Sequence, residues 1–417
     1  MPDEAEMDLD GHSVEEQLKA FQISSLKDED LDEEEGEAAD SNSDDVDDDD
    51  CEAEPVTLGF VEKPKNGWSL LCHMFPSKAG GLPAWLDPIN LPSGKSSLCD
   101  ICQTPLQFLL QVYAPISEKE STFHRSLFVF MCTSMECILQ DKREQWKCPP
   151  EKASRSVKVF RCQLPCSNPF YSSEPPRGDG TDKPSGIGAR LCNWCGTWNG
   201  DKVCSSCRKA HYCSEKHQVM HWRSGHKFVC RQMKTSSESS NSIPVNNRTT
   251  SNKLEKVASN TLWPEYEIIN EDECEFDIEM SEDNGYSSSL VSNDRSDETF
   301  KALLKHFEAD DDKKSWTSFQ ECIGKAPEQV LRYCRSPRAK PVWPISSGRP
   351  SQVDAPKCRY CGGPSVFEFQ ILPQLLYYFG VKDDVDCLDW STIAVYTCEA
   401  SCEASLSYKE EFAWIQV

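Results

Sequence analysis

The feature that most constrains this chain is a run of four cysteine- or histidine-containing pairs between residues 192 and 230. Two or three residues separate the members of each pair, so both side chains of a pair can reach one metal ion. Thiolates and imidazoles in this number favour tetrahedral zinc. Alternate pairs are expected to share an ion in a cross-brace. The first ion is then held by Cys192, Cys195, Cys213 and His217, and the second by Cys204, Cys207, His226 and Cys230.

A segment this short buries too little apolar surface to fold without its metal. Four protein ligands fill each tetrahedral site and leave no position for a catalytic water, which disfavours zinc hydrolysis. His211 and His221 lie nearby but outside the spacing, and we expect neither to be a ligand. The tryptophans of the segment could line a peptide-binding groove or pack into its small core, and the sequence does not separate the two (Trp194, Trp198 and Trp222).

Cysteine is abundant along the whole chain, with 23 in 417 residues. The N-terminal residues lack the basic and apolar regions of a signal peptide, and no apolar run is long enough to predict a membrane span. Abundant cysteine without a secretory signal indicates metal binding rather than disulfides. The sequence therefore predicts a protein of a reducing compartment, cytoplasm or nucleus, with no membrane role.

Charge is distributed very unevenly. Residues 1–54 hold 24 acids against Lys19 and Lys27, which gives −22 of the net −25. This acidic tail is predicted to be disordered, because it has little apolar surface to bury. A second acidic stretch, Glu265–Glu298, sums to −12, whereas residues 186–235 carry nine Lys or Arg against two acids, a local +7. Acidic tails could attract a basic partner over long range, or only keep the chain soluble.

An internal repeat flanks the segment with the four pairs, residues 192–230, which is called the finger from here on. Cys99–Val112 aligns with Cys358–Ile371 at an offset of 259, with Cys, Pro, Phe and Gln in register. Further on, Leu127–Cys132 parallels Ile393–Cys398. Each copy therefore has a C-x2-C pair, two apolar strands and a second cysteine pair. A single copy would bury little core, so the two copies are expected to pack as one pseudo-symmetric body.

The repeated cysteines could form one further zinc site in each half. The candidate ligands are Cys99, Cys102, Cys132 and Cys137 in the first half, and Cys358, Cys361, Cys398 and Cys402 in the second. Buried cysteine without metal, packed as a small apolar residue, is the alternative. A thioredoxin-like redox pair is disfavoured, because neither C-x2-C begins a helix within a βαβ unit.

These patterns predict a mixed α+β, β-rich fold. It has two related zinc-ribbon-like halves, an inserted small zinc finger and disordered acidic segments. Strands are expected at Thr57–Val61, Leu106–Tyr113 and Leu127–Met131, and helices at Thr299–Phe307 and Pro327–Arg335. Trp85, within Ser77–Asp87, is expected to mark a binding edge or to anchor the core. The predicted boundaries are 1–54 acidic tail, 55–170 N-terminal half, 171–188 linker, 189–232 finger, 233–298 linker with acidic stretch and 299–417 C-terminal half.

Two resemblances follow from these residues. Tyr212–Cys230 resembles the end of a MYND finger, with the C-x3-H-Q spacing, a tryptophan and the closing H-K-x2-C. The folded chain resembles the programmed cell death protein 2 family, over about residues 55–232 and 262–417. The segments that carry this second resemblance are Leu58–Phe60, Ser77–Asp87, Cys99–Tyr113, Gln329–Tyr333 and Cys358–Cys402. The long acidic N-terminus is a departure from the usual form of that family.

The family resemblance implies a dedicated chaperone that captures one newly made small-subunit ribosomal protein during ribosome biogenesis. A MYND adaptor that binds proline-rich peptides in transcription or chromatin regulation is the alternative. No P-loop, nucleophile elbow or H-E-x-x-H motif occurs, so an enzyme is not expected. Direct nucleic-acid binding is disfavoured, because the ligand spacing does not match a finger that reads the major groove and the flanking segments are acidic.

Overall fold

The computed structural model of the protein describes residues 55–146, 153–182, 186–238, 257–259, 261–276, 311–350, 355–381 and 387–417. The acidic tail, the predicted helix Thr299–Phe307 and most of the second acidic stretch lie outside these residues. What the structure describes is dominated by antiparallel strands, with few helices.

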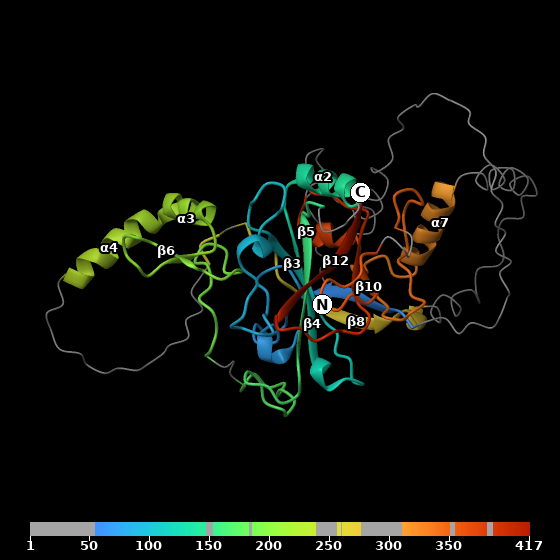
Figure 1. The fold of residues 1–417 in the computed structure, drawn as a ribbon, viewed down its shortest axis with the longest axis horizontal. Helices are drawn as coiled ribbons and strands as arrows, with labels where there is room; N and C mark the ends of the chain where they lie inside the picture. The colour runs from blue at the N-terminus through green and yellow to red at the C-terminus, as the bar shows by residue number, and fades with distance from the viewer. Residues whose placement is uncertain are drawn as a thin grey trace, which may run out of the picture.

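Ten strands close into one barrel (Figure 1). In chain order they are β1 (Thr57–Glu62), β2 (Lys78–Ala79), β3 (Gln107–Tyr113), β4 (His124–Met131), β5 (Val157–Leu164), β8 (Tyr266–Asp272), β9 (Leu331–Tyr333), β10 (Ser365–Ile371), β11 (Thr392–Cys398) and β12 (Tyr408–Gln416). Around the barrel the order is β1-β8-β2-β3-β4-β5-β12-β11-β10-β9, with β9 next to β1. The three strands predicted from the sequence are all confirmed.

The repeat becomes a two-fold arrangement of these strands. Strands β2 to β5 follow one another in the first half, and β9 to β12 do so in the second. The first strand of each half is exchanged: β1 pairs with β9, and β8 pairs with β2. Both copies also bear an irregularity in register at the same place, between Phe108 and Leu110 and between Phe367 and Phe369. The two halves therefore form one body, as the repeat predicts.

Separate zinc-ribbon halves are not confirmed among the described residues. The apolar strands of each copy continue into the shared barrel instead of ending in a short ribbon. Along β4, Leu127 and Val129 belong to the barrel core, while Phe128 and Phe130 point to the opposite face. All of β4 is buried because both of its faces are covered. A strand that is apolar on both faces needs two packing layers, and an isolated ribbon would supply only one.

A buried ion pair joins the two halves. Arg125 on β4 donates from Nη1 and Nη2 to the two carboxylate oxygens of Glu368 on β10, at 2.5 and 2.7 Å. Both side chains are fully buried. Thr397 and Tyr333 donate their hydroxyls to the same carboxylate, so the charge of Glu368 is fully hydrogen-bonded inside the protein.

Short helices accompany the barrel, and Ile138, Leu375 and Leu376 from two of them are buried in its core. The helices are α2 (Met135–Glu144), α3 (Glu215–His221), the π-type turn η5 (Trp222–His226), α4 (Lys227–Glu238), α7 (Asp311–Gly324) and α8 (Gln374–Tyr378), with short 3-10 turns η1 (Cys72–Met74), η2 (Gly94–Ser97) and η3 (Glu120–Thr122). In Figure 1, α3 and α4 lie on one flank of the barrel and α7 on the other. None of the helices that the structure describes is both long and apolar enough to cross a membrane.

Two expectations about local structure are wrong. The predicted helix Pro327–Arg335 is not helical: it contains strand β9, which lies between β1 and β10 and hydrogen-bonds to both. Strand β8 lies inside the stretch 233–298 that the sequence indicates as a linker. Its Ile268 enters the core, while Glu267 and Glu271 remain outside it. With one buried side chain among acidic neighbours, the segment shows no apolar pattern typical of a strand.

Candidate metal centres

Four clusters of metal-ligating side chains occur in the described residues. Within each cluster the four ligand atoms lie within 4.8 Å of one another. Two clusters belong to the finger (Cys192, Cys195, Cys213 and His217; Cys204, Cys207, His226 and Cys230) and match the predicted cross-brace. The other two belong to the halves of the barrel (Cys99, Cys102, Cys132 and Cys137; Cys358, Cys361, Cys398 and Cys402).

The distances within the clusters fit tetrahedral zinc. A Zn–S bond of about 2.3 Å places two sulfur ligands about 3.8 Å apart. The sulfur pairs are 3.6 to 3.9 Å apart (Cys102–Cys132, Cys361–Cys398, Cys358–Cys402, Cys195–Cys213 and Cys204–Cys230). A disulfide would bring the sulfurs to about 2.0 Å. The donor sets of four cysteines, or three cysteines and one histidine, suit zinc as well.

Each C-x2-C pair is shaped by the same turn. The residue four positions after the first cysteine donates its N–H to the carbonyl of that cysteine, at 2.7 to 2.9 Å. The donor has a left-handed backbone in all four turns, with φ between 54° and 73° (Gln103, Gly196, Arg208 and Gly362). Such a turn aims both thiols at one point. Two of the four turns lack glycine, so glycine spacing alone would not have found them.

Short helices position the histidines of the finger. Ser214 begins α3 by accepting a hydrogen bond from the backbone N–H of His217. The Nδ1 atom of His217 is 3.1 Å from the Cys213 sulfur. The Nε2 atom of His226 is 3.6 Å from the Cys207 sulfur. Gly225, with φ of 147°, allows the kink that turns His226 towards its cluster.

The second cysteine pair of each barrel cluster comes from the end of a core strand. Cys132 follows β4, Cys137 is in α2, and Cys398 is the last residue of β11. Hydrogen bonding between the two sulfurs lowers the pKa of the Cys99 thiol to about 5 and raises the pKa of the Cys132 thiol, so Cys99 is the first of the pair to become a thiolate. A metal ion bound by each cluster would therefore attach the C-x2-C loop to the end of a barrel strand.

The nearby histidines lie outside the clusters, as expected. His221 Nδ1 is 3.1 Å from the Tyr212 hydroxyl, and His211 Nδ1 is 3.1 Å from the Gly200 carbonyl. The tryptophan question is also answered: Trp194 and Trp198 are buried, while Trp222 is 38% exposed. Only Trp222 remains available for a groove on the surface of the finger.

The finger is fixed to the N-terminal half by aromatic packing that the sequence did not predict. Trp198 packs against Phe130 in a tilted arrangement, with the ring centroids 4.3 Å apart, and donates its Nε1–H to the carbonyl of Leu106 at 2.8 Å. In return, Trp85 donates its Nε1–H to the carbonyl of Thr197 at 2.9 Å. Trp85 is therefore a core anchor, because it is 5% exposed.

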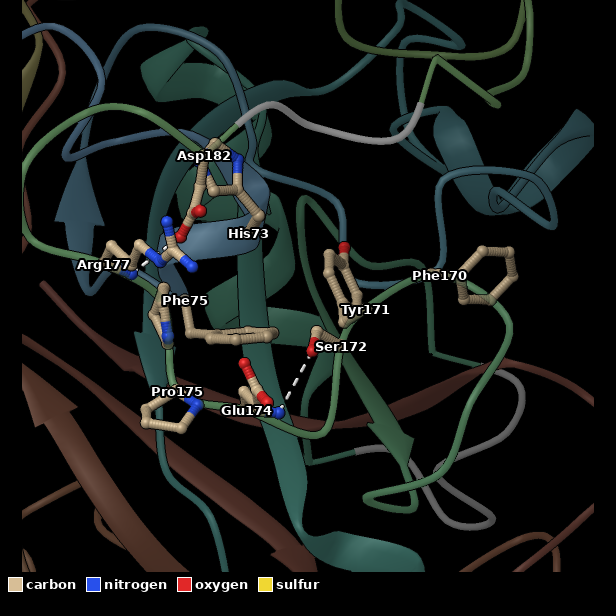
Figure 2. A pocket seen from close by; sticks show the side chains of 10 residues that line it. His73, Phe75, Phe170, Tyr171, Ser172, Glu174, Pro175, Arg177 and Asp182 are labelled. Atoms are coloured by element: carbon tan, nitrogen blue, oxygen red, sulfur yellow. Dashed lines mark hydrogen bonds between the residues drawn. The ribbon is translucent and has the colours of Figure 1, made fainter.

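A small pocket of about 200 Å³ lies beside η1 (Figure 2). Figure 2 shows Arg177 and Asp182 at one side of it, where the Arg177 backbone N–H donates to the Asp182 carboxylate at 2.6 Å. Tyr171 lines the pocket and donates its hydroxyl to the Leu86 carbonyl at 2.8 Å. The start of the segment predicted as a linker is thus packed against the barrel.

Three models of known protein families match this chain, in the same order as its N-terminal half, finger and C-terminal half. The N-terminal domain model of programmed cell death protein 2 matches residues 55–178, a MYND finger model matches 192–230, and the putative C-terminal domain model matches 313–417. Programmed cell death protein 2 of Bos taurus is 37% identical over 372 residues, which cover 87% of this chain and 97% of that protein. This chain belongs to the programmed cell death protein 2 family.

Other members of the family extend the comparison. Programmed cell death protein 2 of Rattus norvegicus is 38% identical over 371 residues, covering 87% of this chain and 97% of that protein. A Homo sapiens protein called programmed cell death protein 2-like is 23% identical over 385 residues, covering 84% of this chain and 92% of that protein. No solved structure matches. Membership of the programmed cell death protein 2 family and the MYND finger together support a protein-binding role and zinc binding.

Proposed function

We propose that this protein is a non-enzymatic chaperone for one newly made, basic small-subunit ribosomal protein. The observation that carries the proposal is the composition of the four clusters: each offers four protein ligands, which complete a tetrahedral shell. Metal bound in this way stabilises a surface and leaves no position for a substrate or a catalytic water. The surface itself is then what acts on a partner.

The proposal includes four zinc ions, two in the finger and one in each half of the barrel. Native mass spectrometry of the reduced full chain should show four tightly held ions. The double substitution Cys358→Ser and Cys361→Ser should lower the count to three, while substitution of the unclustered Cys166 by serine should leave it at four. A count of two in the unsubstituted chain would limit zinc to the finger.

Charge supports a basic client. Residues 1–54 carry −22 and the stretch Glu265–Glu298 carries −12. Ribosomal proteins are strongly basic and bind RNA non-specifically before assembly. Acidic segments accelerate encounter with such a protein and screen its charge, an effect that weakens as ionic strength rises.

Selective ribosome profiling tests the client. Ribosomes that the tagged full chain captures should be enriched in the message of one basic small-subunit protein, from the point at which the binding segment has left the exit tunnel. A chain in which the acids of residues 28–54 are changed to Asn and Gln serves as the control for charge. Capture of no ribosomal-protein message, or equal enrichment of all messages, contradicts the chaperone proposal.

A second function is favoured by the exposed apolar surface of the finger. Five apolar side chains on α3, η5 and α4 are 38 to 68% exposed (Val219, Met220, Trp222, Phe228 and Val229). Basic residues accompany them (Arg223, Lys227 and Arg231). We propose that this face can bind proline-rich peptides, which dock on aromatic surfaces. Titration of the full chain and of Trp222→Ala with such peptides tests it: equal, flat curves contradict the adaptor role.

A further inference from the structure

Equivalent outer faces of the two halves of the barrel are covered by different parts of the chain. In the first half, Phe108 pairs across the strands with Phe130, and the finger covers them. In the second half, Phe367 pairs with Tyr396 at the equivalent position, just before the same irregularity in register. This face is overlaid by residues 336–350, which leave a groove of about 630 Å³. The second half therefore presents a hollow where the first half holds the finger.

The groove combines aromatic surface with unpaired positive charge. It is lined by Pro337, Lys340, Trp343, Arg349, Phe367 and Tyr396. Lys340 and Arg349 are exposed, and neither forms an ion pair with a residue that the structure describes. Residues 335–350 contain four cations and no acid. An anionic ligand is the complement of such a surface.

Tyr396 supplies a polar group that points to a ligand. Its side chain is 9% exposed and lines the groove, yet its hydroxyl has no hydrogen-bond partner among the described residues. The hydroxyl oxygen itself is not buried, so it faces the solvent of the groove, where it can donate a hydrogen bond. A carbonyl or carboxylate oxygen in the groove would accept it.

The pairing of β1 with β9 directs the chain before Thr57 towards this groove. Thr57 lies opposite Tyr333 in the antiparallel pair β1–β9, and Leu58 lies opposite Arg332. The chain that precedes Thr57 therefore continues in the direction of residues 334 to 336, where the groove begins. Residues 28–54 carry 17 acids and no Lys or Arg. We propose that residues 28–54 bind in the groove of the second half, with carboxylates on Lys340, Arg349 and Tyr396.

Attachment through β1 makes this contact intramolecular. A short link to the docking site gives an effective concentration of roughly millimolar, so weak contacts are enough to populate the bound form. The contact forms in the free protein and does not depend on which client the protein binds. A basic partner that takes up residues 28–54 would at the same time uncover the groove.

Zero-length cross-linking of the full chain tests the proposal, with a reagent that couples lysine amines to carboxylates. Residues 28–54 should couple to Lys340. Lys63 and Lys65 are the internal control, because they are exposed, closer in sequence, and at the opposite end of β1, about 20 Å away at the rise of a strand. Coupling to Lys340 should exceed coupling to either of them, and should fall as salt is raised.

Two variants and an isotope experiment complete the test. Arg349→Glu, which adds a repelling charge at the exposed rim, should abolish the Lys340 cross-link, and Tyr396→Phe should weaken it. Unchanged zinc content and circular dichroism will show that the variants are folded. If Lys340 and Lys63 couple equally in all variants, or if residues 28–54 couple to finger lysines instead, the proposal is overturned. Cross-links between light and heavy chains in a mixture would assign the groove to a second copy, and would overturn it too.

Discussion

Neutralising Glu368 is a direct test of the barrel that joins the two halves. The carboxylate is 0% exposed and forms a bidentate pair with Arg125, which is also 0% exposed. Glu368→Gln leaves the guanidinium buried without its counter-charge. Removal of one partner from such a pair costs about 3–5 kcal/mol. Since whole domains are stable by about 5–15 kcal/mol, this variant should approach the limit of folding.

Replacing both partners should cost much less than replacing one. In the double variant Arg125→Met and Glu368→Met no charge is left unpaired, and the exchange of a buried pair for apolar side chains is often nearly neutral. Urea unfolding of the three full-length proteins at constant zinc, followed by circular dichroism, measures the difference. A loss below about 1 kcal/mol for Glu368→Gln, the range of exposed ion pairs, would refute the buried bridge.

The dependence of stability on pH should also test the Arg125–Glu368 pair. Burial raises the pKa of the Glu368 carboxyl, but Arg125 outweighs it, and the net pKa lies below the ordinary value. A carboxylate whose folded pKa is depressed stabilises the fold above its unfolded pKa of about 4.3, and loses this contribution as pH falls through the folded value. The unsubstituted protein should therefore lose stability below that pH, and Glu368→Gln should lose less there.

Three further predictions concern the finger and one turn. Trp198→Ala should destabilise the finger–barrel contact by about 3–5 kcal/mol, measured as faster proteolysis of the finger at constant zinc; exposed Trp222→Ala is the control. Removal of zinc by a strong chelator should unfold the finger, since a structural zinc contributes about 10–16 kcal/mol in such peptides; an unchanged finger spectrum would contradict this. Gly80→Ala should lower the melting temperature, because its Cβ would meet the Pro264 carbonyl at a φ of +65°, whereas Gly67→Ala, with open space, should not.

The sequence predicted what depends on local spacing. The eight finger ligands could be grouped because C-x2-C turns and closing pairs act over a few residues. The strands at Thr57–Val61, Leu106–Tyr113 and Leu127–Met131 were visible because β-branched and aromatic residues cluster there. The copies at offset 259 indicated one body because each alone has too little core.

What the sequence did not predict depends on partners far along the chain. Strand β9 is helical by local preference, and becomes a strand only because β1 and β10 offer backbone groups on both sides. Strand β8 was not predicted, because its acidic residues are typical of a linker and only Ile268 is buried. Burial of Trp85 and Trp198 could not be decided, since each donates its indole N–H to a backbone carbonyl of the other module, Trp85 to Thr197 and Trp198 to Leu106.

The exchange of β1 and β8 between the halves determines when the strands of the barrel can pair during synthesis. Thr57 finds its neighbours at Asp272 and Tyr333, so the first strand leaves the ribosome long before either pairing partner is synthesised. Strand β5 likewise waits for β12, whose Tyr408 lies opposite Cys162. Until then the nascent first half exposes two unpaired sheet edges, which are prone to join other chains. Completion of the barrel therefore follows synthesis of the second half, and a chain that stops before β12 would leave a sheet with open edges.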